Sequence, residues 1–472
     1  MGVELEEAGE KWKAGDSAKA LRFFLKAVNQ YDAGLQNFPT SFDLAYNKAR
    51  LQYAITQQPR LIHQLPGALL DYLTVAGSSH DFALKLHGEN PDVLFNLAQV
   101  YSSLAEALLE TQDDIASQRS EASNLLHQAL NHLQHCLEVQ KESFAKADWQ
   151  PQSPVAGECE ELTGKHHAES AEEVWVSVVE PVTEDTLLDT HLAQLACLKS
   201  LCDIQSSAIP DKLAFIEDAY TRGLDEVVDQ YAQRTNHDRE VKIARAAFLS
   251  SYANARFRLY RTNPPAFEGE FGRSISPLEM WPGFNGDTEA LCLSGDAHLE
   301  VNVGLETRIT ESAEPSRELC ETVNRLRWVH ITKALDRYTL ASKVPNQAHL
   351  ARIHISRGDC ELLRCRLGDE PFNYDLAEKS RVTLVKNASI YYGAAAMVTS
   401  RDPQMFQSAE DTIELEIKVG VVAALQDDQS QILTTALQRH SVKGREQLHE
   451  ISEQGLVGGK AWDKIKHVVA TS

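Results

Sequence analysis

Positive charge is scarce in this sequence of 472 residues. Lys and Arg total 46 against 68 for Asp and Glu, which gives a formal net charge of −22. Because phosphate binding needs clustered positive charge, this balance argues against a general nucleic-acid-binding protein. The same balance favours a basic protein partner, which an acidic surface attracts and holds.

Cysteine and long apolar runs are sparse as well. The eight cysteines are too few for a disulfide scaffold, and the acidic start Met1–Glu7 lacks the apolar core of a signal peptide. No stretch approaches the roughly 18 consecutive apolar residues of a membrane span. We therefore expect reduced thiols, no membrane association, and a cytoplasmic or nuclear location.

Signatures of catalysis and of cofactor binding are missing from the sequence. There is no Walker loop, dinucleotide fingerprint, nucleophile elbow, kinase set or zincin motif. The carboxylate pairs Glu160–Glu161 and Glu172–Glu173 lie in a polar segment, whereas acid/base catalysis needs a dry pocket that separates the two pKa values. We predict a non-enzymatic protein without a cofactor.

Some His and Cys residues lie close together in sequence, but their spacing does not suit zinc. His349, His354, Cys360 and Cys365 fall within 17 residues. On helices these positions rotate around the axis instead of converging as a Cys-x2-Cys pair does. We interpret them as packing residues on helical faces and predict no metal site.

Apolar residues recur at intervals of three and four along most of the chain, which indicates amphipathic helices. The first two helices flank Gly15–Asp16, with small residues at Ala8, Ala20 and Ala27 and a bulky one at Phe24. This arrangement around a Gly-Asp turn resembles the tetratricopeptide repeat (TPR), a helix-turn-helix unit of about 34 residues. The resemblance implies an all-α fold, a right-handed α-solenoid of TPR-like helical hairpins.

Further units of this kind are expected along the chain. Segments 43–51 and 90–101 look like first helices and share a Tyr/Phe-Asn-x-Ala core, and Gly358–Asp359 is expected to form another turn. The units become irregular toward the C-terminus. We predict TPR-like repeats over 1–147, a continued helical array over 187–261, and C-terminal repeats over 317–472.

Two long loop insertions are expected to interrupt this array. The first, 148–186, is rich in Pro and Glu. Residues 151–190 hold ten acids and one Lys, about two-fifths of the net negative charge. The second, 262–316, is rich in Gly and Pro. Its four large aromatic residues, Phe267, Phe271, Trp281 and Phe284, predict an ordered loop.

The resemblance to the TPR family implies protein binding: a scaffold or a dedicated chaperone for a basic client of the ribosomal-protein or histone type. Some family members bind heat-shock chaperones through a clamp of Lys, Asn and Arg. Asn47 and Asn96 match the clamp Asn and Arg50 lies nearby, although Asn at this position also packs structurally in many repeats. The candidate partner-binding residues are Asn47, Arg50, Asn96, Glu158, Glu160, Glu161, Glu172, Glu173 and Trp175.

Two questions stay open at this level. The cation-rich stretch from Arg234 to Arg261 fits either a groove for an acidic peptide or RNA, or internal ion pairs with the acidic remainder, which we favour. The chain is alternatively a structural subunit of a larger assembly, with an apolar interface at Trp175 and at the aromatic residues of 262–316.

Overall fold

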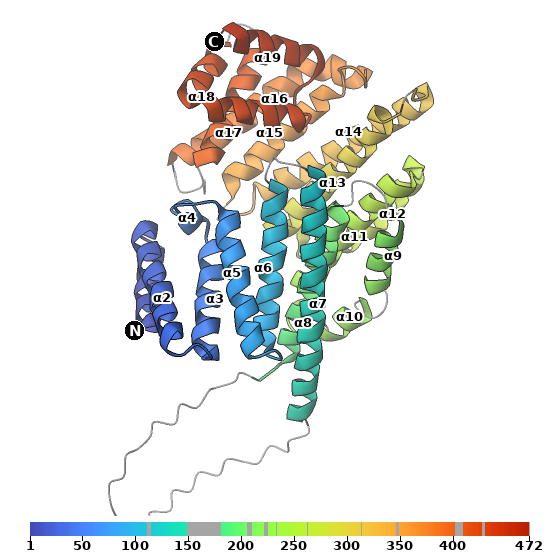
Figure 1. Ribbon diagram of the computed structural model, residues 1–472. Helices are drawn as coiled ribbons and strands as arrows, with labels where there is room; N and C mark the ends of the chain where they lie inside the picture. Colours follow the sequence, from blue (N-terminus) through green and yellow to red (C-terminus); the bar gives the residue numbers. More distant parts are fainter. Residues whose placement is uncertain are drawn as a thin grey trace, which may run out of the picture.

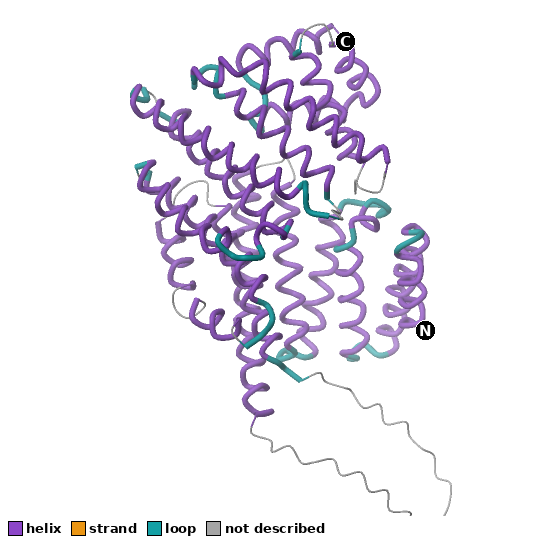
Figure 2. The backbone as a smooth tube through the Cα atoms, turned by 180° about the vertical axis from the view of Figure 1, so that it is seen from behind, coloured by secondary structure: helices purple, strands orange, loops and turns teal. Residues whose placement is uncertain are grey.

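The computed structural model describes residues 1–110, 115–148, 181–204, 210–220, 225–232, 234–261, 263–312, 314–345, 349–401, 409–426 and 430–471. Within these ranges the regular structure is helical and there is no strand (Figures 1 and 2). The helices are α1 (Gly2–Lys13), α2 (Ser17–Asn37), α3 (Phe42–Thr56), α4 (Pro59–Ile62), α5 (Leu69–Leu86), α6 (Pro91–Glu110), α7 (Ile115–Asp148), α8 (Glu184–Ile204), α9 (Pro210–Ala219), α10 (Asp225–Ala232), α11 (Asp238–Tyr260), α12 (Pro264–Glu279), α13 (Thr288–Thr310), α14 (Arg317–Ala341), α15 (Leu350–Arg366), α16 (Asp375–Arg401), α17 (Ala409–Leu425), α18 (Ser430–Glu453) and α19 (Gly459–Thr471). No helix of these ranges is long and apolar enough to cross a membrane.

Successive helices pack in pairs, so the chain forms an all-α solenoid, as predicted. The pairs are α1 with α2, α3 with α5, α6 with α7, α8 with α11, α13 with α14, α15 with α16, and α17 with α18. Figure 1 shows the N-terminal pairs side by side, with the C-terminal pairs above them. Each pair buries its apolar face against its neighbours, as in other helical-repeat arrays.

The first pair confirms the Gly15–Asp16 turn. The side chain of Asp16 accepts a hydrogen bond from the backbone N–H of Lys19 at 2.9 Å and so caps α2. Close approach of α1 and α2 depends on Gly9, because a Cβ atom there would lie 2.4 Å from the ring of Phe24. Glycine is thus needed at this contact.

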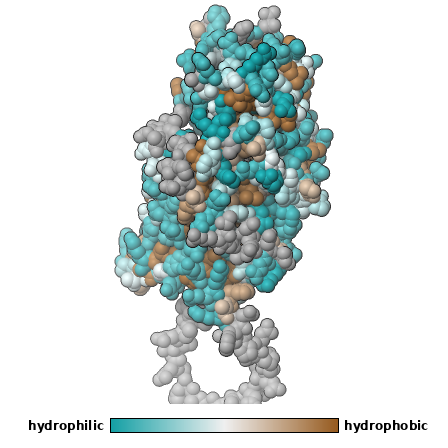
Figure 3. Space-filling view, turned by 90° about the vertical axis from the view of Figure 1, so that its right-hand side faces the viewer, coloured by the Kyte–Doolittle hydropathy of each residue, from teal (hydrophilic) through white to brown (hydrophobic). Residues whose placement is uncertain are grey.

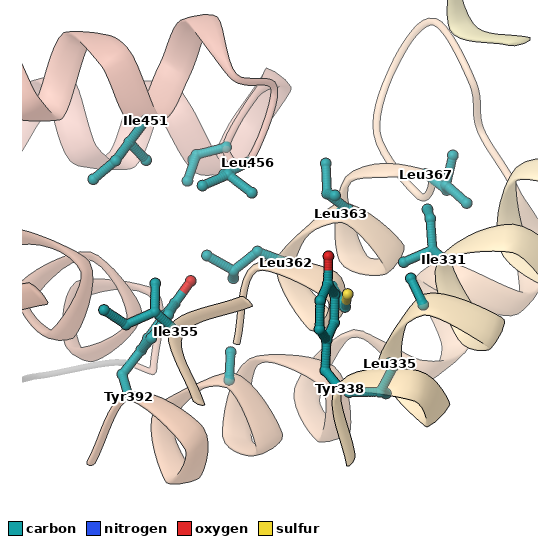
Figure 4. Packing of buried hydrophobic residues seen from close by; sticks show 14 of the residues in the cluster. Ile331, Leu335, Tyr338, Ile355, Leu362, Leu363, Leu367, Tyr392, Ile451 and Leu456 are labelled. Atoms are coloured by element: carbon teal, nitrogen blue, oxygen red, sulfur yellow. The ribbon is translucent and has the colours of Figure 1, made fainter. Parts of the chain in front are cut away.

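The expected turn at Gly358–Asp359 is wrong, because both residues lie in the middle of α15. Gly358 faces Tyr392 of α16, and an added Cβ atom would lie 2.3 Å from its ring. Gly295 of α13 and Tyr338 of α14 repeat this contact, at 2.8 Å. Figure 4 shows both tyrosines among aliphatic side chains of the core. Glycine at these positions serves close packing between helices rather than a turn.

The second predicted loop insertion, 262–316, is also wrong, since it holds α12 and α13. Pro264 and Pro265 occupy the first positions of α12, where a missing backbone N–H costs little, and Pro277 lies in its last turn. Phe267, Phe271 and Phe284 are buried, so the prediction of order is confirmed. Their burial also removes them from the apolar interface proposed for an assembly subunit.

Candidate protein-binding surface

Four carboxylates from three helices form what we call the acidic surface: Glu106 of α6, Asp203 of α8, and Asp296 and Glu300 of α13. Asp296 and Glu300 are four residues apart and therefore share one face of α13. Lys199 lies one turn before Asp203 on α8, and its Nζ atom is 2.6 Å from the Asp203 carboxylate. α6, α8 and α13 are each the first helix of a pair.

The carboxyl group of Glu300 shows how crowded the negative charge is. Burial, reinforced by the charges of Asp203 and Asp296, raises the pKa of Glu300 to about 7 against the opposing effect of Lys199. Near neutral pH a sizeable fraction of the molecules therefore carries a proton at this site. A cation brought to Glu300 would displace that proton and relieve the repulsion.

The pKa of Lys199 shows the effect of the same carboxylates on a positively charged group. Although burial alone lowers the pKa of an amine, the charges of Asp203, Glu300 and Glu106 together raise the pKa of Lys199. Carboxylates from α6, α8 and α13 therefore act on one ammonium group. They lie close together in space, although they are far apart in the sequence.

Asp296 is the carboxylate of this surface that is held in place. The hydroxyl of Tyr338 donates a hydrogen bond to it at 2.5 Å. Its side chain is exposed to water, yet protein surrounds it on several sides, so desolvation raises the pKa of Asp296. The surface thus combines an oriented carboxylate with accessibility to a partner.

Asp359, in the next pair of helices, occupies a position equivalent to that of Asp296 but has different neighbours. Asp359 of α15 accepts a hydrogen bond from Tyr392 at 2.6 Å, just as Asp296 accepts one from Tyr338. Here, however, Lys418 of α17 lies 2.9 Å from Asp359 and 2.7 Å from Glu414, and its side chain is only 2% exposed. A buried cation therefore bridges both carboxylates of the C-terminal site, whereas Lys199 of the acidic surface is half-buried and forms its ion pair with Asp203.

Two of the predicted clamp residues have partners within the chain. Arg50 on α3 forms an ion pair with Glu6 of α1 at 2.5 Å, and the side chain of Asn96 on α6 donates a hydrogen bond to Tyr46 of α3 at 3.0 Å. Asn47 lies half-buried on α3. Asn96 therefore ties neighbouring pairs together, which is the structural role that the sequence left open, and the clamp stays a prediction.

The remaining candidate residues belong to the acidic insertion. Glu158, Glu160, Glu161, Glu172, Glu173 and Trp175 lie outside the described residues. Among the described ones, Glu184 opens α8 at the end of the predicted segment 148–186. The role of this insertion as a client site stays a prediction.

The cation-rich stretch pairs internally, as favoured from the sequence. Its ion pairs join Arg234 to Glu184, Arg239 to Asp287 and Glu289, Lys242 to Asp238, Arg256 to Glu270, and Arg261 to Glu311. Arg258 donates a hydrogen bond to the backbone carbonyl of Cys202 at 3.2 Å. These partners lie on α8, α11 and α12 and on or directly beside α13, so this stretch helps to hold its own part of the array together.

Of the residues considered for zinc, His354 is half-buried on α15, whereas His349 is exposed just before this helix and so is not the packing residue that we predicted. Cys360 and Cys365 are buried, and burial raises the pKa of the Cys365 thiol to about 11. In the part of the chain that the structure describes, no three or more His, Cys, Asp or Glu side chains are arranged to hold a metal ion. A protonated buried thiol is a poor metal ligand and a poor nucleophile.

A buried chain of polar groups between α12, α13 and α14 was not predicted from the sequence. His330 contacts Glu268 at 2.6 Å through Nε2 and His298 at 2.8 Å through Nδ1. Nε2 of His298 lies 3.6 Å from Glu279, which also accepts a hydrogen bond from Ser294. Burial lowers the pKa of His298 to about 4, so its imidazole is neutral near pH 7. Both rings are buried, and the chain of contacts fastens α12 to the array.

Comparison with known proteins places the chain beside one curated relative and two solved structures. No protein-family model matches it. A Schizosaccharomyces pombe protein described as UPF0656 protein C926.02 is 26% identical over 404 residues, which are 84% of this chain and 82% of the relative. A circular tandem repeat protein aligns with a TM-score of 0.33 and 12% identity over 99% of this chain and 96% of that one. Yeast Tom70 aligns with a TM-score of 0.16 and 11% identity over 99% and 95%.

Proposed function

We propose that this chain is a non-enzymatic protein-binding scaffold or dedicated chaperone whose acidic surface receives a basic segment of a client protein. A client of the ribosomal-protein or histone type would supply the Lys and Arg side chains. The observation that carries the proposal is the clustering of Glu300 with Asp203 and Asp296, whose charges together with burial raise the pKa of Glu300 to about 7 although Lys199 and Arg258 oppose them. Repulsion between the carboxylates raises the free energy of the unbound site. Binding of a cation therefore lowers the free energy by relieving this repulsion.

The contrast with Asp359 supports the same conclusion. Where the fold needs a charged carboxylate only for its own stability, a buried Lys418 compensates it. At the acidic surface Lys199 and Arg258 do not outweigh the effect of burial and of the neighbouring carboxylates on the pKa of Glu300, and three helices contribute carboxylates. Repulsion between these carboxylates does not stabilise the fold, and binding of a basic partner would relieve it.

The proposal is tested by titrating the full chain with a fluorescent Lys/Arg-rich peptide and measuring anisotropy at low and high salt. The triple variant Glu106→Gln, Asp203→Asn, Glu300→Gln should weaken binding about tenfold or more, because close interfacial charge pairs each contribute of the order of 1 kcal/mol. Its binding should also depend less steeply on salt.

A control variant makes the same change of net charge elsewhere. Glu121→Gln, Glu138→Gln, Glu142→Gln removes three exposed carboxylates of α7. It should bind the peptide nearly as tightly as the unmodified chain. Equal losses in the two triple variants would show that only overall charge matters, and the acidic surface would then have no special role.

A further inference from the structure

The outer face of α16 carries three strongly exposed apolar side chains. Val382, Ile390 and Met397 are 84%, 56% and 58% exposed. The buried side of the helix, which includes Ala388, Tyr392 and Ala395, points the opposite way. At 3.6 residues per turn, the exposed residues follow one stripe along the helix. Apolar patches also appear among hydrophilic surface in the upper part of Figure 3.

Positive charge runs along the same stripe. Between positions 379 and 401 the sequence has no Asp or Glu but four cations, of which Arg381 pairs with Asp369 and Glu378. Lys379, Lys386 and Arg401 are exposed, and none of them forms an ion pair with any residue that the structure describes. Unpaired cations among exposed apolar side chains favour a partner with the complementary pattern.

A groove lies beside the C-terminal end of this helix, where Ala396, Thr399 and Ser400 line it. It has a volume of about 640 Å³ and lies between α16 and α18, with α17 at its base. Its apolar lining includes Ala396, Leu415, Val419, Ile432 and Ala436. At its edge Glu416 and Arg439 neutralise each other at 2.8 Å, so the groove itself is close to neutral. A helix laid along α16 could place an apolar side chain here.

We propose that this outer face of α16, together with the groove beside it, docks an acidic amphipathic helix of a partner protein. The distribution of charge along the chain favours this location for an acidic partner. Residues 1–316 include 25 basic and 48 acidic residues, whereas residues 317–472 include 21 basic and 20 acidic residues. An acidic partner is therefore repelled by residues 1–316, whereas the nearly balanced charge of residues 317–472 allows it to bind at α16. The net charge of −22 also opposes an anionic membrane surface. The proposal does not rest on the acidic surface, which would serve a partner of opposite charge.

The test uses two synthetic helical peptides of about twenty residues with the same Leu repeat, one filled with Glu and the other with Lys. The full chain should bind the Glu peptide at least tenfold more tightly than the Lys peptide in a fluorescence titration. The double variant Ile390→Ser, Met397→Ser should lose at least tenfold in affinity for the Glu peptide. Lys379→Glu, Lys386→Glu should lose a similar factor and show a weaker salt dependence.

A matched control replaces exposed valines on other helices. Val303 of α13 and Val442 of α18 are 55% and 67% exposed, so Val303→Ser, Val442→Ser should bind the Glu peptide normally. Four outcomes overturn the proposal: equal affinity for both peptides, no binding of either, the same loss in the control, or binding of phosphatidylserine vesicles in place of the Glu peptide. If Ile390→Ser, Met397→Ser fails to fold, the Lys379→Glu, Lys386→Glu variant decides by the same measurement.

Discussion

The ring of Tyr392 lies directly over Gly358, so closely that a Cβ atom added to the glycine would be 2.3 Å from Cε1 of the tyrosine. The hydroxyl of the same tyrosine donates a hydrogen bond to Asp359, the next residue of α15. Gly295, Asp296 and Tyr338 repeat this arrangement. In both pairs of helices, a glycine admits the ring and the neighbouring carboxylate fixes the hydroxyl.

The contact predicts that Gly358→Ala destabilises the protein. Alanine is the better helix former by about 1 kcal/mol, but overpacking against Tyr392 should cost about 1–3 kcal/mol. Gly393 of α16 is the control, because an added Cβ there has no atom within 4 Å. Gly393→Ala should stabilise by about 0.5–1 kcal/mol. Urea unfolding measures both changes, and an increase in stability for Gly358→Ala would contradict the close packing.

The buried cation of α17 gives a second prediction. Lys418→Met leaves Asp359 and Glu414 without their cation, and breaking a buried pair in this way costs about 3–5 kcal/mol. Lys443→Met removes a comparable ion pair with Glu410, but both of those side chains are exposed. That change should cost less than about 1 kcal/mol. Similar unfolding free energies for the two variants would refute the structural importance of Lys418.

Acid should destabilise the fold through its buried histidines. Burial lowers the pKa of both His298 and His191 from 6.5 to about 4. The unfolded chain therefore binds more protons between these values, so stability is fully present above about pH 6.5 and is lost as the pH falls toward 4. Each group contributes up to about 3 kcal/mol to this loss.

The pH dependence is checked by urea unfolding at a series of pH values for the unmodified chain and for His298→Gln. Glutamine does not titrate, so the variant should lose less stability between neutral and acidic pH. The same slope in both proteins would mean that His298 does not remain neutral in the folded state.

Much of the architecture could be predicted from the sequence because it depends on local patterns. Apolar periodicity and the Gly15–Asp16 turn with its Asp cap are properties of short segments, and they predicted the helices and the first pair. The error at 262–316 came from treating proline as a helix breaker when Pro264 and Pro265 begin a helix. The error at Gly358 arose because the residue that requires glycine, Tyr392, lies on another helix.

The candidate surface could not be predicted from the sequence in the same way. Local spacing places Lys199 with Asp203, and Asp296 with Glu300, on single helical faces. That these two faces share one electrostatic environment depends on the packing of α8, α11 and α13. The sequence drew attention instead to the densest run of acids, in 148–186, because a count along the chain detects only charges that are adjacent in sequence.

Binding of a basic client segment at the acidic surface can be recognised by the number of protons released on binding. Near pH 7 the Glu300 carboxyl is partly protonated, and a bound cation should lower its pKa and release up to about half a proton. Calorimetric titration of the Lys/Arg-rich peptide in two buffers of different ionisation enthalpy measures this number. We predict release from the unmodified chain and markedly less from Glu300→Gln. Binding without proton release, or the same release from both proteins, would show that the peptide does not bind at Glu300.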